Sequence, residues 1–154
     1  MAKVIGEVTR EIAAPLEVCW DLLVDAGAYP TWYRTLDEVV VEEKDDQGRP
    51  GTIGVRCDVG SVGSIRFRLE LVYEDQRRIT ATQTGRGEMV KDAATEWVLE
   101  MVGPQQTRTT YRVSIGSDGL KAAAAFRGAE GLVRRHLIDG FGDALKARAE
   151  QSDP

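Results

Sequence analysis

The clearest pattern in the chain is an alternation of apolar and charged residues over positions 65–74. Charged side chains fill most of the even positions (Arg66, Arg68, Glu70), with Val72 as the exception. The odd positions hold Ile65, Phe67, Leu69, Leu71 and Tyr73. Because successive side chains of a strand point to opposite faces, this pattern predicts a strand with one buried and one solvated face, as in an antiparallel sheet.

Six more segments have strand-like composition, and turn signals separate several of them. The segments are residues 3–12, 36–43, 52–59, 78–84, 94–102 and 107–115. The run Asp45–Gly51 and the run Gly103–Gln106 are rich in turn-forming residues. Together with residues 65–74, these six segments predict a seven-stranded antiparallel sheet.

Three helices are predicted, two short and one long. After Pro15, which suits the start of a helix, Leu16, Cys19, Trp20 and Leu23 recur at helical spacing. We expect this helix to end near position 27 and a second short helix to cover residues 29–35. Residues 120–149 contain no proline and predict the long helix. Steps of 100° per residue give it an apolar face made of Ala122, Phe126, Ala129, Val133, Leu137, Gly140 and Ala144.

The order of these elements favours an α+β fold in one domain. Strand, two short helices, six strands and a long helix would form residues 3–149, followed by a disordered tail at 150–154. A twisted seven-stranded sheet curls, and a single helix about 10 Å wide is narrower than its concave face. We therefore expect a cavity between the sheet and the long helix.

Several short motifs support this arrangement. They are Ala14-Pro15 with Trp20 at a helix start, the segment Tyr29-Pro30-x-Trp32, and the strand segment that begins at Trp97. With the long terminal helix, they resemble the START-like (SRPBCC) superfamily, and within it the polyketide cyclase/dehydrase and lipid-transport group. The resemblance covers nearly the whole chain and implies a helix-grip fold, in which a curved sheet wraps around the long helix.

The resemblance also implies an apolar ligand in the cavity, a lipid- or polyketide-like molecule. Trp32 and Tyr33 would border the entrance, or would instead plug the end of the core. Inward-facing side chains would line the cavity or form ordinary core. Tyr73, Gln83 and Tyr111 would orient the polar end of the ligand or bond to neighbouring backbone. The candidate ligand-binding residues are Trp32, Tyr33, Phe67, Leu69, Leu71, Tyr73, Gln83, Trp97, Leu99, Tyr111, Val113, Phe126, Val133, Leu137 and Phe141.

An enzymatic role is the first alternative, because some relatives are polyketide cyclases or dehydratases. Such chemistry needs an acid or base, and the candidates are His136, Glu130 and Tyr111. No pattern of a catalytic triad accompanies them. A second alternative is a protein-interaction or chaperone-like module that uses the aromatic second helix.

Composition and charge narrow the classes of partner. The 154 residues include 20 Lys and Arg against 25 Asp and Glu, a net charge of −5, which disfavours nucleic-acid binding. Cys19 and Cys57 lack the spacing of a metal site, so we expect two buried thiols and no metal or other cofactor. No run of about 18 apolar residues occurs, so no membrane-spanning helix is expected. The N-terminus has no signal-peptide pattern, which predicts a cytoplasmic protein, and a homodimer stays open.

Overall fold

The structure is a computed structural model that describes residues 2–58, 64–85, 92–116 and 134–151. Helices α1 and α2 and a short 3-10 turn lie between the first two strands, and a terminal helix follows the last strand. The strands are β1 (Ala2–Ile12), β2 (Leu36–Lys44), β3 (Pro50–Asp58), β4 (Ser64–Glu74), β5 (Arg78–Gln83), β6 (Ala94–Gly103) and β7 (Gln106–Gly116). The helices are α1 (Leu16–Val24), η1 (Ala26–Ala28), α2 (Tyr29–Trp32), η4 (Arg134–Asp139) and α5 (Gly140–Gln151).

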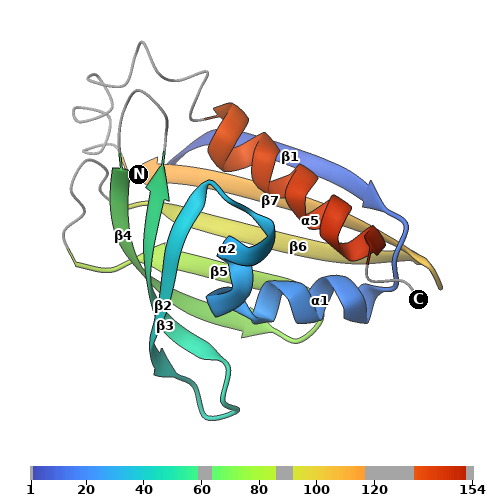
Figure 1. Ribbon diagram of the computed structural model, residues 1–154, viewed down its shortest axis with the longest axis horizontal. Coiled ribbons are helices and arrows are strands. Elements are labelled where there is room, and N and C mark those ends of the chain that lie inside the picture. Colours follow the sequence, from blue (N-terminus) through green and yellow to red (C-terminus); the bar gives the residue numbers. More distant parts are fainter. Residues whose placement is uncertain (1, 59–63, 86–91, 117–133, 152–154) are drawn as a thin grey trace.

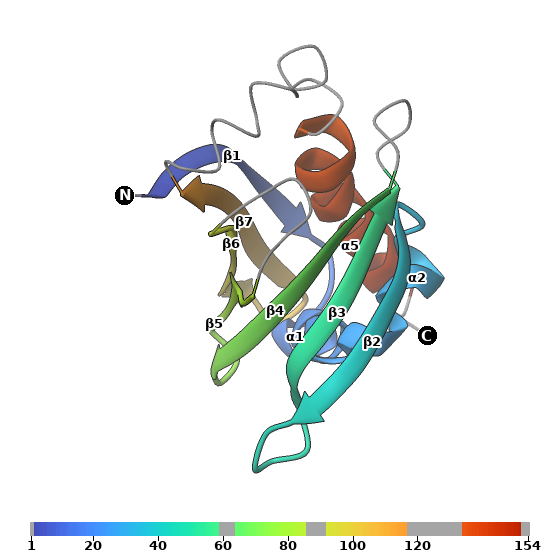
Figure 2. The same ribbon diagram turned by 90° about the vertical axis from the view of Figure 1, so that its left-hand side faces the viewer.

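The seven strands form one antiparallel sheet, in the order β1-β7-β6-β5-β4-β3-β2. Figure 2 shows the sheet curling from β1 round to β2, with α5 on its concave side. The α+β helix-grip fold expected from the sequence is confirmed. The alternation along β4 is confirmed as well, since Ile65 and Leu71 are buried and Arg66, Arg68 and Glu70 are exposed.

The two short helices close one end of the concave side (Figure 1). Helix α1 buries Cys19, Trp20 and Leu23, and Pro15 occupies its N-cap position, where the missing proline N–H leaves no helical bond unmade. Helix α2 ends at Trp32, earlier than the predicted boundary at residue 35, because Tyr33 adopts an extended backbone conformation.

Over the part that the structure describes, the buried face of the terminal helix is displaced by one residue from the predicted face, and Phe141, also predicted to point inward, is buried. Ile138, Phe141 and Leu145 are buried, whereas Leu137 and Ala144 are only half-buried. The cause is η4, a π-helical segment, in which the hydrogen bonds span five residues and each turn holds more residues than an α-turn. Uniform steps of 100° therefore misplace the side chains beyond it. Residues 120–133 of the predicted helix lie outside the described residues.

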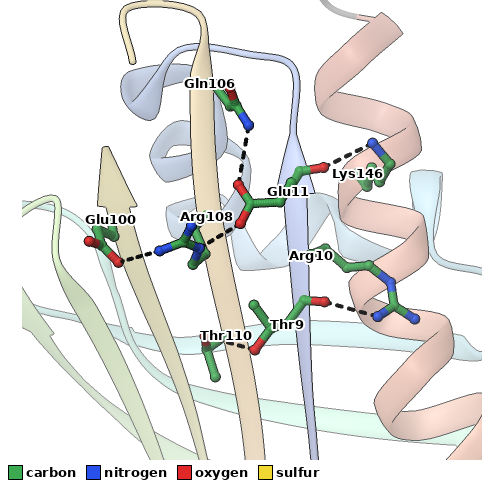
Figure 3. A network of polar contacts seen from close by, with 8 residues as sticks. All are labelled: Thr9, Arg10, Glu11, Glu100, Gln106, Arg108, Thr110 and Lys146. Carbon is green, nitrogen blue, oxygen red and sulfur yellow. Dashed lines mark hydrogen bonds and ion pairs between the residues drawn. The ribbon is translucent and has the colours of Figure 1, made fainter. Parts of the chain in front are cut away.

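The end of the same helix corrects the predicted tail. Glu150 and Gln151 belong to α5, and the carboxylate of Glu150 accepts the backbone N–H of Ala13 at 2.9 Å and pairs with Lys146. Lys146 also donates to the carbonyl oxygen of Glu11 at 2.9 Å. These bonds attach α5 to the end of β1, as Figure 3 shows for Lys146 and Glu11.

Close contact between β1 and the π-helical segment depends on glycine. A Cβ atom on Gly6 would lie 2.4 Å from Cδ1 of Ile138, far inside van der Waals contact. The register of β1 against β7 shifts between Val4 and Gly6, so the strand is irregular where Ile138 packs. The absence of a side chain at this position lets the helix lie directly on the strand.

Charged pairs cover the outer face of the sheet. Arg108 on β7 bonds to Glu11 on β1 and lies 3.4 Å from Glu100 on β6 (Figure 3). Arg112 pairs with Glu7 in the same way at 2.6 Å. Because these groups are well exposed, each pair contributes little to stability. The pairs do place opposite charges directly across from each other on neighbouring strands, which favours this register.

Candidate ligand-binding site

One end of the concave side is a closed core. Ile12, Leu23 and Leu145 are fully buried there, together with two threonines on β7, Thr107 and Thr109. The Thr107 hydroxyl donates to the carbonyl oxygen of Ala14 at 2.8 Å, which anchors β7 to the chain entering α1. The side chains at this end are therefore shielded from solvent.

An aromatic cluster around Phe141 of α5 lies next to this core. The Phe141 ring stacks on Tyr33, with centroids 4.7 Å apart, and meets Trp97 and Tyr111 edge-on at 5.1 Å. Trp97 and Tyr111 stack on each other at 4.5 Å from neighbouring strands. Phe141 therefore contacts β6, β7 and the segment after α2 at once. These contacts set how closely α5 packs on the sheet.

Inner-face side chains farther along the strands are less covered, and we call them the half-buried patch. It consists of Phe67, Leu69, Gln83, Thr95 and Val113. These residues come from four adjacent strands, β4 to β7, and three of them are apolar and pack against the core cluster. A partly covered apolar surface on the inside of a curved sheet is a place where a small apolar molecule can bind.

The hydroxyl of Tyr33 is the most informative polar group of the site. Tyr33 is only 5% exposed, and its oxygen is fully buried without a hydrogen-bond partner in the described part of the chain. Burial raises the pKa of this phenol, and the nearby Thr35 side chain offsets the rise only partly, without forming a hydrogen bond of normal geometry. A buried polar atom without a partner is costly, so a bound molecule that supplied one would be favoured.

Gly140, the first residue of α5, lies beside this hydroxyl. A Cβ atom at Gly140 would lie 3.6 Å from the Tyr33 oxygen and 3.0 Å from the carbonyl oxygen of Arg135. The Tyr33 hydroxyl therefore lies where the π-helical segment passes into α5. π-Helical turns are frequent at functional sites.

The hydroxyl of Tyr111 connects Tyr33 to the half-buried patch. Its pKa is raised mainly by burial and then by the neighbouring Tyr33 and Cys57, whereas the Thr95 side chain lowers it. Burial likewise raises the pKa of the Cys57 thiol to about 12. At neutral pH the site therefore contains uncharged hydroxyl and thiol groups.

Two predicted polar ligand contacts bond to backbone. The Tyr73 hydroxyl donates to the carbonyl oxygen of Pro50 at 2.6 Å, and its ring lies under the Arg49 guanidinium and edge-on to Trp20. The Gln83 side chain accepts the backbone N–H of Ala93 at 2.9 Å. Of the two alternatives given for these side chains, a contact with the ligand or a bond to neighbouring backbone, the structure shows the second.

The remaining predicted residues are distributed between core and surface. Leu71 and Leu99 are buried in the core, and Leu137 is half-buried on the terminal helix. Trp32 is half-buried and touches Phe141 from the outer side. It also lines an external recess between α2 and α5, formed with Thr31, Ala144, Ala147, Arg148 and Gln151. Phe126, Glu130, Val133 and the side chain of His136 lie outside the described residues.

Sequence reasoning did not single out Thr95 or Cys57 as members of the site. The signal for Thr95 is its alternation with Trp97 and Leu99, which places all three on one face of β6. Cys57 alternates in the same way with Val55 and Ile53 on β3. Thr95 was not named on the apolar face of this strand, and Cys57 was correctly expected to be buried, with no role in the site assigned to it.

The described ranges contain neither a metal-type cluster of side chains nor a membrane-spanning helix. Within residues 2–58, 64–85, 92–116 and 134–151, no group of three or more His, Cys, Asp or Glu side chains is arranged to hold a metal ion. None of the helices in this part of the chain combines the length and apolarity needed to cross a membrane.

Comparisons with known proteins agree with the fold. A model of the family described as "Polyketide cyclase / dehydrase and lipid transport" matches residues 3–150. Among curated protein sequences, no significant match was found.

Solved structures of three proteins superimpose well. The Zhui aromatase/cyclase from Streptomyces sp. R1128 has a TM-score of 0.81 at 20% identity, over 98% of this chain and 95% of that one. A START superfamily protein from Mycobacterium smegmatis has a TM-score of 0.78 at 18% identity, over 96% and 98% of the two chains. The di-domain aromatase/cyclase StfQ of the steffimycin biosynthetic pathway has a TM-score of 0.69 at 16% identity, over 95% of this chain but only 44% of that chain. The TM-scores establish a shared fold with these three proteins.

Proposed function

Because the chain belongs to the polyketide cyclase/dehydrase and lipid transport family, we propose that it binds an aromatic or otherwise hydrophobic small molecule on the concave side of its sheet. The family and the fold support binding of hydrophobic ligands or cyclase-type roles. The proposed site is the half-buried patch together with the hydroxyls of Tyr33 and Tyr111. The observation that carries the proposal is the buried Tyr33 hydroxyl, which has no hydrogen-bond partner among the described residues.

The energetics of such binding follow from the surface involved. Phe67, Leu69 and Val113 present apolar area to the interior, and a ligand that covers it gains about 25 cal/mol for each Å² removed from water. The costs of ordering the ligand offset part of this gain. The Tyr33 hydroxyl would orient the polar end, because a bound acceptor would satisfy it.

The test is binding of a neutral reporter dye, with a steric block as the variant. Nile red emission is titrated against the wild type, Leu69→Trp and Val72→Trp. Leu69 lies on the inner face of β4, while Val72 lies on its outer face and is 63% exposed. Each variant is first required to keep the circular dichroism spectrum of the wild type.

We expect saturable binding by the wild type and by Val72→Trp, and at least a tenfold weaker affinity for Leu69→Trp. Native mass spectrometry should find one dye molecule per chain. Equal binding by all three proteins would place the dye outside the half-buried patch. An absence of saturable binding in the wild type would contradict the proposed function.

A cyclase- or dehydratase-type activity is the second candidate. The observation that favours it is the pair of neutral phenols, Tyr33 and Tyr111, whose raised pKa values suit them to donate hydrogen bonds to a developing enolate oxygen rather than to remove a proton. Turnover of a poly-β-ketone substrate that Tyr33→Phe and Tyr111→Phe each slow more than tenfold would support it. Turnover that neither substitution changes would exclude this assignment of the two phenols.

A further inference from the structure

We propose that helix α5 closes the free edge of β1 against a second copy of this chain. β1 is the first strand in the sheet order, so β7 is its one neighbour in the described sheet and its other edge faces outward. Such an edge presents backbone N–H and C=O groups to which another strand can add. In this protein, charged side chains already bond to backbone groups in the second half of β1 and just beyond it.

Two carbonyl groups of β1, two residues apart, accept hydrogen bonds from cations. The carbonyl oxygen of Thr9 accepts from the Arg10 guanidinium at 3.0 Å, and that of Glu11 accepts from the Lys146 ammonium at 2.9 Å (Figure 3). In an antiparallel strand, alternate residues direct their backbone groups to opposite sides. The spacing of two is therefore the one expected of the groups that point away from β7. A strand added at this edge would need the same two carbonyl groups.

Ion pairs with α5 hold both cations in place. Arg10 pairs with Asp143 at 2.6 Å, and Lys146 pairs with Glu150. The Glu150 carboxylate also accepts the backbone N–H of Ala13 at 2.9 Å, one step of two residues farther along the chain. The helix that packs on β1 thus also supplies the groups that close its edge.

The opposite edge of the sheet, formed by β2, is protected by charge instead. β2 (Leu36–Lys44) carries four acidic residues and one lysine, and its pairing with β3 shifts register at three places. Two such strands would repel each other, and an irregular edge pairs poorly. β1 balances Lys3 and Arg10 against Glu7 and Glu11, so its charge does not oppose a second β1. We therefore assign a second copy of this strand as the partner that the side-chain bonds exclude.

The experiment removes the donors that occupy the edge and measures self-association. The edge variant is Arg10→Met with Lys146→Met, which keeps most of the length of both side chains. The matched control is Arg108→Met with Arg112→Met. It removes two cations that pair with the two glutamates of the same strand on the outer face of the sheet and leaves the edge bonds in place. Sedimentation velocity over a range of protein concentrations gives the dimer dissociation constant, and circular dichroism checks that each variant is folded.

We expect the dimer dissociation constant of the edge variant to be at least about tenfold lower than that of the wild type, because dimerisation no longer breaks two bonds in each copy. The control should self-associate as the wild type does. In the dimer of the edge variant, the amide protons of Thr9 and Glu11 should exchange more slowly than in its monomer, since new strand bonds would protect them. Lys146→Met alone, at a side chain that is 40% exposed, should shift the constant less in the same direction, and it serves as the test if the double variant does not fold.

Three results would overturn the inference. One is a folded edge variant, double or single, that self-associates no more tightly than the wild type. Another is a dimer in which the Thr9 and Glu11 amides exchange as fast as in the monomer, because the contact would then lie elsewhere. The third is equally strong association of the control, which would show that loss of charge alone is the cause. None of these results bears on binding of Nile red, so the proposed function is tested separately.

Discussion

Two threonines on the inner face of β7 provide a matched pair for measuring what an unmade hydrogen bond costs. Thr107 and Thr109 are 0% and 1% exposed, and they lie on the same face of the same strand. The Thr107 hydroxyl donates to the carbonyl oxygen of Ala14 at 2.8 Å, whereas the Thr109 hydroxyl has no partner among the described residues. Valine replaces threonine with little change of shape, so the two substitutions differ mainly in this hydrogen bond.

The expected effects have opposite signs. Thr107→Val leaves the buried carbonyl of Ala14 unsatisfied and should lower the free energy of unfolding by about 1–3 kcal/mol. Thr109→Val removes a hydroxyl that is already unsatisfied, so it should leave stability unchanged or raise it by about 1 kcal/mol. For a chain of this size, a loss of about 2 kcal/mol corresponds to a fall in Tm of about 4–8 °C.

Urea denaturation followed by tryptophan fluorescence measures both effects. The slope m should be the same for the wild type and both variants, so that the shift in midpoint reports stability alone. If Thr109→Val proves as destabilising as Thr107→Val, then the Thr109 hydroxyl has a partner or its loss disturbs packing, and the reasoning fails.

Three further predictions concern packing, pH and thiol chemistry. Gly6→Ala should lower the free energy of unfolding by about 1–3 kcal/mol, because its Cβ would lie 2.4 Å from Cδ1 of Ile138. The control Gly54→Ala, whose Cβ would lie 3.9 Å from the nearest atom outside its chain neighbours, in the Glu42 side chain, should cost less. Thermal melts of both variants test this. The pKa of Glu150 is lowered by the backbone N–H that it accepts and by its ion pair, so its contribution to stability is full above the ordinary glutamate pKa and is lost as pH falls through the lowered value. The Tm of Glu150→Gln should therefore fall less steeply below pH 5 than that of the wild type, and parallel Tm–pH curves would contradict this. The Cys57 thiol, with a pKa of about 12, should react with a disulfide reagent at pH 8 only after unfolding, and rapid labelling of the native protein would show that it is accessible.

The sheet was predictable because its signal is local. Alternation along β4 identifies the inner face from that strand alone, and the burial of Ile65 and Leu71 follows the pattern. The same holds for α1, where Cys19, Trp20 and Leu23 are buried at helical spacing. Each of these patterns needs only the period of one regular element.

The details of the site depend on contacts between distant segments, which no local pattern encodes. Tyr33 stacks on Phe141, more than a hundred residues later in the chain, and Tyr73 bonds to Pro50 because β3 and β4 meet in one particular register. The face of the terminal helix was misjudged for a related reason. Packing of Ile138 against Gly6 accompanies a π-helical segment that the residue period does not reveal.

The pairing of the first strand with the last has a consequence for how the protein is made. Residues of β1 hydrogen-bond only to β7 within the sheet, with Ala2 opposite Gly116 and Ile12 opposite Thr107. At about 5–20 residues per second, a ribosome needs roughly 5–20 s to synthesise the residues between the two strands. During that time β1 has no partner strand, and α5, which covers it, is made later still. Completion of the sheet therefore waits until β7 has left the ribosome, and such long-range pairing slows folding.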